Sequence, residues 1–267
     1  MFFSREKNIN AFWFMRKEWT LTQGNVGDII TPYLIENISG IFPKLKTKGG
    51  NRHLVVGSLI SLLQNKDQVW GAGLIKDMIV PKRKNVKFYA VRGPLTRDKL
   101  IESGYEADDI PQVYGDPGIL VSDYFKFERN IQHKIGIIPH YVDAELCKIY
   151  FKDTDVHFID INNSVEKFFA EINKCEYILS SSLHGIIFSE SYGIKAIPIK
   201  LGDKLIGDSF KFDDYYQSTG RNSKRVVIDS ILNNNDIEKL TRNYDFIKPI
   251  LDKELLLRSC PFNKGEI

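Results

Sequence analysis

A short stretch at positions 180–185, SSSLHG, places three hydroxyl groups and an imidazole next to one another. Residues 176–181 have the apolar character of a strand, and residues 183–192 have the pattern of a helix. Ser181, Ser182, Leu183, His184 and Gly185 would therefore stand where a strand becomes a helix. Hydroxyls, free helix N–H groups and an imidazole that meet at such a point can bind an anion. The structural alternative is that a serine caps the helix while His184 packs in the core.

A second candidate site is the sequence GNVGD at positions 24–28, directly before a helical pattern at 27–38. Gly24 and Gly27 flank Asn25, and glycine lets a backbone approach a ligand closely. The helix would offer N–H groups to an anion, and Asp28 could contact a sugar hydroxyl. The structural alternative is that Asn25 or Asp28 caps the helix and the glycines form a turn. The spacing is neither the dinucleotide-binding G-x-G-x-x-G motif nor a P-loop.

Arg92 follows an apolar strand pattern at 86–91 and stands directly before Gly93 and Pro94, which open a helical pattern. Its guanidinium can offer a planar fork to a carboxylate or a phosphate. A salt bridge between two domains is the structural alternative, and the sequence leaves that choice open.

Four further polar residues stand at expected strand or helix ends. His140 follows a strand pattern and can contact a phosphate or transfer a proton, although histidines at strand ends are more often structural. Asp116 lies between a glycine and a proline and is more often a turn residue. We expect Asp143 to cap the next helix. Glu190 stands six positions after His184, and spacing does not decide whether it faces a cleft or solvent.

The elements that must position these residues alternate along the chain. Strand patterns lie at 10–14, 53–58, 68–73, 86–91, 134–140, 155–161, 176–181 and 195–200, and helical patterns at 27–38, 94–103, 143–152, 164–174 and 183–192. Pro94 suits the first turn of a helix, and Gly104 and Gly193 suit helix ends. Strand–helix alternation favours an α/β fold with parallel sheets. The tail after 225 has a helical character.

The alternation runs twice, and a charged stretch at 126–134 separates the two runs. We expect two Rossmann-like domains with parallel sheets facing across a cleft, residues 1–130 and residues 131–267, the second carrying the C-terminal helices. In such sheets ligands bind beyond the carboxyl ends of the strands, where the candidate residues stand.

Composition narrows the class of protein. The 267 residues are 43% apolar and 27% charged, and the net charge of +3 does not suggest nucleic acid. No apolar run is long enough for a membrane span, and the start is too charged for a signal peptide. Cys147, Cys175 and Cys260 show neither metal nor disulfide spacing, so we expect no metal and a cytoplasmic location.

These residues together resemble the polysaccharide pyruvyl transferase family. The resemblance rests on GNVGD (24–28), VWGAG (69–73), VRGPLT (91–96), GDP (115–117), IPHYVD (138–143) and SLHG (182–185), which occur in the family's order from about residue 9 to about residue 200. It implies a GT-B-like fold with the active site between the domains. It also implies transfer of pyruvate from phosphoenolpyruvate, without a cofactor, to sugar hydroxyls as a ketal, in capsule or exopolysaccharide synthesis.

The resemblance also implies residue roles. Arg92 and His184 would bind the carboxylate and phosphate of phosphoenolpyruvate; His184 or His140 would donate a proton, and Asp28 would act as base or contact the acceptor. We include the flanking Gly24, Asn25, Gly27, Gly93, Ser181, Ser182, Leu183, Gly185 and Glu190 as substrate-binding candidates. Relatives often carry arginine where this chain has Ser182, and Lys195, Lys200 and Lys204 are candidates to replace that charge.

Several alternatives stay open. The glycan acceptor is free or lipid-linked, and the protein is cytoplasmic or bound at the inner face of the cytoplasmic membrane. The aromatic start (Phe12, Trp13, Phe14, Trp19) lines an acceptor site, lies near a membrane or forms an edge strand and loop. A GT-B glycosyltransferase with a nucleotide-sugar donor is the main alternative function. A non-catalytic glycan- or anion-binding protein is the third.

Overall fold

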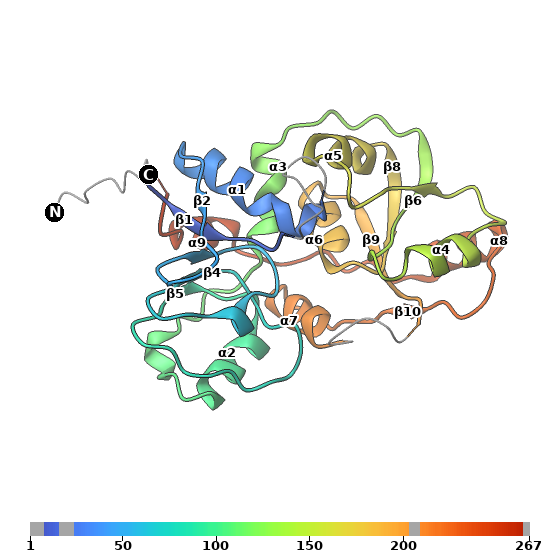
Figure 1. Cartoon of the computed structure of the whole chain (residues 1–267). Helices are drawn as coiled ribbons and strands as arrows, with labels where there is room; N and C mark the ends of the chain where they lie inside the picture. Colours follow the sequence, from blue (N-terminus) through green and yellow to red (C-terminus); the bar gives the residue numbers. More distant parts are fainter. Residues whose placement is uncertain (1–7, 16–23, 203–208, 264–267) are drawn as a thin grey trace.

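The structure, a computed structural model, describes residues 8–15, 24–202 and 209–263, and two parallel five-stranded sheets organise these residues (Figure 1). The first sheet has the order β2-β1-β3-β4-β5, with strands β1 Asn10–Phe12, β2 Lys44–Leu45, β3 His53–Leu54, β4 Gln68–Trp70 and β5 Lys87–Ala90. The second has the order β10-β9-β8-β6-β7, with strands β6 His133–Ile138, β7 His157–Phe158, β8 Cys175–Ser180, β9 Lys195–Lys200 and β10 Val226–Val227. The predicted α/β class with parallel sheets is therefore confirmed.

The two sheets share one topology. Counted within each half of the chain, the strand order of both sheets is 2-1-3-4-5, which is the flavodoxin-like doubly wound order. The order reverses between β1 and β3 in the first sheet and between β6 and β8 in the second. Ligands of such sheets bind beyond the carboxyl ends of the strands at this reversal. His140 follows β6 and the serine triplet ends β8, so both stand at the reversal of the second sheet.

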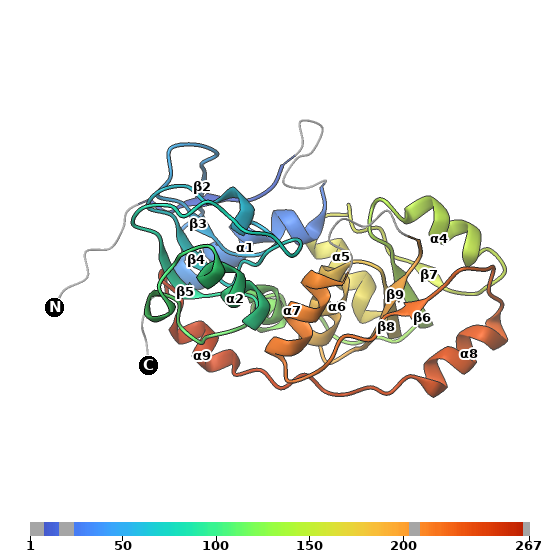
Figure 2. The ribbon, with the colours of Figure 1, turned by 90° about the horizontal axis from the view of Figure 1, so that it is seen from below.

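Helices connect the strands and cover the sheets (Figures 1 and 2). They are α1 Val26–Ser39, α2 Pro94–Glu102, α3 Val121–Tyr124, α4 Ala144–Tyr150, α5 Val165–Asn173, α6 Leu183–Ser191, α7 Phe210–Ser218, α8 Asn234–Asn243 and α9 Lys253–Arg258, with short 3-10 turns at Ile60–Leu62, Ala107–Asp109 and Pro117–Leu120. None of the helices in the described ranges is long and apolar enough to cross a membrane.

Local signals explain where several helices begin and end. Pro94 opens α2 after Gly93, as predicted. Gly104 and Gly193 follow α2 and α6 with φ of 90° and 70°, a left-handed conformation that glycine adopts without strain. Asp143 stands at the N-cap position of α4, as predicted, but its side chain makes no capping hydrogen bond.

The predicted edge position of the first strand is also wrong. β1 pairs with β2 on one side and with β3 on the other, so it lies inside the sheet. The strand β2, which covers it, has two residues and is too short to show a period of two in the sequence. Trp13, directly after β1, is 4% exposed and packs in the core. Trp19 lies outside the described residues.

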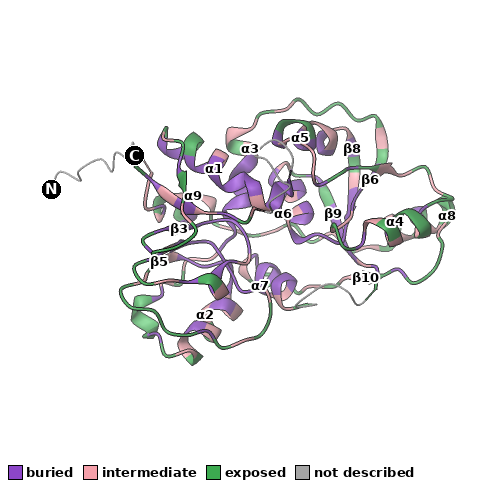
Figure 3. Cartoon of the chain, in the orientation of Figure 1, coloured by how far each residue is buried: buried purple, intermediate pink, exposed green. Residues whose placement is uncertain are grey.

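The buried core runs across both halves of the chain (Figure 3). One cluster contains Ile29 and Leu34 of α1 together with Phe168 and Phe169 of α5 and Phe188 of α6. The C-terminal segment after α8 returns to the first sheet, where Nε1 of Trp70 donates a hydrogen bond to the Leu256 carbonyl at 2.9 Å (Figure 2). The sheets lie on either side of the predicted boundary at 130 and 131, which stays a prediction.

Candidate functional site

The serine triplet forms the turn between β8 and α6 and ties that turn to its neighbour strand. Oγ of Ser180 donates to the Ile138 carbonyl at 2.8 Å and accepts from the N–H of Ser182 at 3.0 Å. Oγ of Ser181 accepts the N–H of His140 at 2.9 Å. The carboxyl ends of β6 and β8 are thus joined at the reversal of strand order. Ser180 and Ser181 therefore stabilise this turn through hydrogen bonds to the backbone.

Ser182 stands at the N-cap of α6, but its side chain makes no capping hydrogen bond. Within the described residues, the N–H groups of Leu183, His184 and Gly185 have no acceptor. This is expected, because the first N–H groups of a helix have no partner within the helix and no side chain caps this one. Gly185 allows a close contact, because a Cβ atom on it would lie 2.3 Å from Oγ of Ser180. The start of α6 therefore has both free N–H groups and the positive end of the helix dipole.

His184 faces an aspartate that comes from the other half of the chain. Its Nε2 lies 3.6 Å from Oδ2 of Asp116, and the two side chains are 15% and 0% exposed. Both atoms are buried and have no hydrogen-bond partner among the described residues. Oδ1 of Asp116 accepts the N–H of Gly118 at 2.9 Å, which fixes the carboxylate. A proton on Nε2 would face this carboxylate.

The Nδ1 side of His184 lies against the start of α1. A Cβ atom on Gly27 would lie only 2.2 Å from Nδ1, so a residue larger than glycine would displace the imidazole. A Cβ atom on Gly57, three residues after β3, would lie 3.9 Å from Cε1 of the same ring. The imidazole that follows β8 is therefore surrounded by turns from the first half of the chain.

The start of α1 differs from the start of α6 in its free N–H groups. Oδ1 of Asn25 accepts the N–H of Gly27 at 2.9 Å, and the Asn25 carbonyl accepts the N–H groups of Asp28 and Ile29. The N–H of Val26 donates to the Ile161 carbonyl at 2.8 Å. Asn25 therefore caps α1, and the backbone of this helix start has few donors left for an anion. Gly24 precedes the cap and is buried.

Arg92 is buried in a network of protein groups. Its Nε lies 3.0 Å from Oδ2 of Asp214 in α7, and both side chains are at most 1% exposed. The other guanidinium nitrogens donate to Oγ of Ser58 and to the Leu74 carbonyl. Gly93 permits the approach of α7, because a Cβ atom there would lie 2.0 Å from the Asp214 carbonyl oxygen. In this structure the donors of Arg92 are thus directed at protein acceptors.

Lys211 is a buried cation that the sequence analysis missed. It is 8% exposed, and among the described residues its ammonium makes no hydrogen bond or ion pair. Burial, followed by repulsion from Arg92 and Arg225, lowers the pKa of Lys211 to about 8, and the carboxylates of Asp28 and Asp143 oppose this shift. Lys211 therefore lies within electrostatic reach of α1 in the first half and of the residues after β6 in the second. No motif surrounds it in the sequence.

The remaining candidates lie apart from His184 or on the rim of the site. Glu190 is at the other end of α6, where it forms an ion pair with Arg221 at 2.7 Å and accepts a hydrogen bond from Tyr215. The His140 ring is half-buried and packs on Tyr141 with 4.5 Å between ring centroids. No group of three or more His, Cys, Asp or Glu in the described ranges is placed to hold a metal ion.

Asp116 has two structural roles, and the sequence clearly indicates only the first of them. It begins a 3-10 turn, as a turn residue should, and its second carboxylate oxygen faces His184. The only sequence signal for the second role is the GDP element at 115–117, which belongs to the motifs that carry the family resemblance.

Comparisons with known proteins agree with this resemblance. Residues 50–203 match the family model described as polysaccharide pyruvyl transferase. The chain is also 31% identical over 207 residues to the uncharacterized protein L143 of Acanthamoeba polyphaga mimivirus. This alignment covers 73% of this chain and 71% of that protein. No solved structure matches the chain significantly. The matched region contains Arg92, Asp116 and His184, and the chain belongs to the polysaccharide pyruvyl transferase family.

Proposed function

We propose that this protein transfers the pyruvyl unit of phosphoenolpyruvate to a glycan and closes a ketal across two of its hydroxyls. Family membership supports pyruvyl transfer in general. The observation that carries the specific proposal is the His184–Asp116 pair beside the uncapped start of α6. The GT-B-like arrangement, with the active site between the two halves, is part of the proposal. A role in capsule or exopolysaccharide synthesis follows from it.

The donor carries a carboxylate and a phosphate and therefore needs positive groups. The free N–H groups of Leu183, His184 and Gly185 lie at the positive N-terminal end of α6 and would bind one anionic group of the donor. Lys211 would hold the other, because it is a buried cation that forms no ion pair within the described residues. This assigns to Lys211 the charge that relatives place at the position of Ser182. Arg92 would position α7, and thus Lys211, through Asp214.

The reaction begins with a proton on C3 of the donor, which makes C2 electrophilic. His184 would deliver that proton, while Asp116 stabilises the charge on the imidazole ring. A sugar hydroxyl then adds to C2 and gives its proton to a base, for which Asp28 and His140 are the candidates. The C2–O bond to phosphate breaks, a second hydroxyl adds to C2, and its proton leaves with the released phosphate.

The test is to incubate the protein with phosphoenolpyruvate and a panel of galactosyl, mannosyl and glucuronosyl acceptors. We expect acceptor-dependent release of phosphate, together with an acceptor whose mass rises by one pyruvate minus one water. Acceptor-dependent release of UDP or CMP from a nucleotide sugar would instead identify a glycosyltransferase. Tight phosphoenolpyruvate binding without turnover on any acceptor would identify a binding protein.

A further inference from the structure

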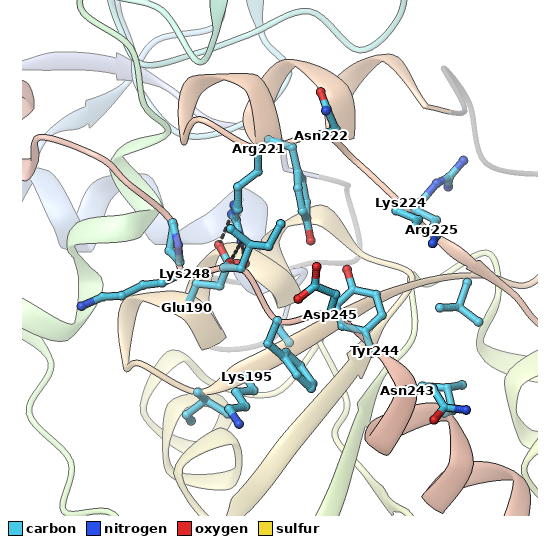
Figure 4. A pocket seen from close by; sticks show the side chains of 18 of the residues that line it. Glu190, Lys195, Arg221, Asn222, Lys224, Arg225, Asn243, Tyr244, Asp245 and Lys248 are labelled. Carbon is cyan, nitrogen blue, oxygen red and sulfur yellow. Dashed lines mark hydrogen bonds and ion pairs between the residues drawn. The ribbon is translucent and has the colours of Figure 1, made fainter.

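A cavity of about 1030 Å³ lies in the second half of the chain, and His184 is not among the residues that line it. Figure 4 shows the lining side chains. Its walls come from the start of β9, residues 221–226, the end of α8 and the chain at 243–249. Glu190, near the end of α6, borders it, whereas His184 is the second residue of α6. At 1.5 Å per residue, six residues separate the two by about 9 Å along the helix. The cavity has the size of a small-molecule site.

The cavity is strongly basic. It is lined by six cationic side chains and two carboxylates, namely Lys195, Arg221, Lys224, Arg225, Lys239 and Lys248 against Glu190 and Asp245. One of these carboxylates, Glu190, is neutralised by its buried ion pair with Arg221. Within the described residues, Lys224, Lys239 and Lys248 have no ion-pair partner. Because the whole chain carries a net charge of only +3, this lining concentrates charge that an anion would neutralise.

Between these charges the wall is mostly apolar. Its aliphatic part consists of Ile194, Ala196, Val226, Leu240, Ile247 and Pro249. Several of these side chains would be covered by a ligand with an aliphatic chain, and covering them is favourable in proportion to the area removed from water. The ligand that fits the cavity is therefore amphipathic, with an apolar body and an anionic group.

Two aromatic side chains of the wall, Phe246 and Tyr216, argue against a stacked nucleotide base. The Lys195 ammonium lies 5.1 Å from the centre of the Phe246 ring, and Tyr177 packs against that ring at 5.6 Å. The Arg221 guanidinium lies 4.4 Å from the centre of the Tyr216 ring. A flat base needs an open aromatic face to stack on, and these faces are already covered by cations or by another ring. An aliphatic chain has no such requirement.

We propose that this cavity binds an anionic lipid, with the phosphate at the lysines of the rim and the aliphatic chain along the apolar wall. The proposal concerns a site separate from His184 and does not rest on the proposed catalytic function. It predicts that neither the phosphate alone nor the chain alone suffices for binding.

The direct test is calorimetric titration of the full chain with farnesyl phosphate below its micellar concentration. We expect saturable binding of one molecule, and an affinity at least about tenfold higher than for farnesol or pyrophosphate, because each of these lacks one of the two contacts. UDP should neither bind as tightly nor compete. If UDP binds more tightly and displaces farnesyl phosphate, the cavity is a nucleotide site and the proposal is wrong.

Matched variants locate the binding site. Lys224→Glu with Lys239→Glu reverses two exposed rim charges and should weaken farnesyl phosphate binding at least about tenfold. Lys44→Glu with Lys87→Glu makes the same charge change at exposed positions of the first sheet and should change the affinity less than about twofold. Ile247→Gln, at a side chain that is 56% exposed, should weaken farnesyl phosphate but not pyrophosphate.

Two results would overturn the proposal. The first is farnesyl phosphate binding that both charge-reversed pairs weaken equally, which would mean attraction to the whole surface. The second is binding to anionic phosphatidylglycerol vesicles without any binding of farnesyl phosphate, which would mean a membrane contact outside the cavity.

Discussion

His184 and Asp116 are 68 positions apart in the sequence, and in the structure their side chains face each other with 3.6 Å between Nε2 and Oδ2. Histidines that act as acids or bases in enzymes usually have one ring nitrogen held by a second group, so that the other nitrogen faces the substrate. Asp116 supplies that group here and is itself fixed by the N–H of Gly118. At the scale of single residues, this pair and Lys211 are the parts of the site that can be tested first.

We expect His184→Ala to lower kcat by about 10²–10⁴-fold, because it removes the proposed general acid. Asp116→Asn should also lower kcat, but it should leave KM for phosphoenolpyruvate nearly unchanged, since it only alters how the imidazole is held. Steady-state kinetics measure both effects. His133→Ala, at the opposite end of β6 from His140, is the matched control and should keep turnover within about twofold. Wild-type kcat in His184→Ala would exclude this role.

Lys211 gives the site a defined pH dependence. Since its pKa lies at about 8, the ammonium is present below that pH and is lost above it. We expect KM for phosphoenolpyruvate to rise as the pH increases from 7 to 9, and we expect Lys211→Met to have a high KM at every pH. Kinetics across this range in wild type and variant measure the effect. A KM that depends on pH equally in both proteins would assign the titration to another group.

The same pKa makes a prediction about stability. The folded-state pKa is lowered from 10.5 to about 8, so between these values the unfolded chain binds a proton that the folded chain does not. The contribution of Lys211 to the free energy of unfolding should therefore increase as the pH rises from 8 to 10.5. Urea unfolding of wild type and Lys211→Met at both ends of this range measures it. An unchanged difference between the two proteins would contradict the lowered pKa.

At the scale of elements, the packing of α7 on α2 decides how Arg92 is used. Oδ1 of Asp214 accepts the N–H of Thr96 at 2.9 Å, and Oδ2 accepts the Thr96 hydroxyl at 2.7 Å and faces Arg92. Asp214 thus caps the start of α2 from a different helix and is 122 positions from Arg92. The family resemblance implies that Arg92 binds an anionic group of phosphoenolpyruvate, which would make it a residue of the site and not of the core. The burial of this network predicts a different result.

We expect Arg92→Ala to lower the free energy of unfolding by about 3–5 kcal/mol, because it leaves Asp214 as a buried charge without its partner. Urea unfolding measures this loss. Lys82→Ala, which breaks the exposed ion pair with Glu106, is the control and should cost less than about 1 kcal/mol. An Arg92→Ala protein that unfolds like wild type but no longer binds phosphoenolpyruvate would instead support the implied role of Arg92 in binding the donor's carboxylate or phosphate.

At the scale of the whole molecule, the C-terminal segment holds the two halves together. It leaves the second half after α8 and places α9 against the first sheet (Figure 2). Leu256 is fully buried there, beside the turn that carries Gly115, whereas its neighbour Leu255 is 44% exposed. Leu256 of α9 is therefore part of the buried core beside the first sheet.

We expect Leu256→Ala to lower the free energy of unfolding by about 2–5 kcal/mol, because a buried leucine loses both its transfer free energy and its packing. Leu255→Ala changes the same residue type in the same helix and should cost under about 1 kcal/mol. Urea unfolding of both variants gives the comparison. Equal losses would mean that α9 is not docked on the first sheet.

Local patterns in the sequence determined most of the elements. The helices predicted at 94–103 and 183–192 are observed at Pro94–Glu102 and Leu183–Ser191, and the strand predicted at 195–200 is observed at Lys195–Lys200. Turn glycines, a proline and the hydrophobic period act over a few neighbouring residues, so a single sequence is enough to detect them. The two-residue strands β2 and β10 were missed, whereas β3 and β7, which also have two residues, stand inside longer apolar stretches that the sequence shows.

Only the tertiary structure decided how the candidate residues are used. The sequence placed Arg92 and His184 at the ends of strands, but it could not show that Asp214 binds one and that Asp116 faces the other. It also gave no sign of Lys211, whose importance comes from burial among groups that are distant in sequence. Burial and charge pairing depend on which surfaces meet when the chain folds, and this information is absent from local residue order.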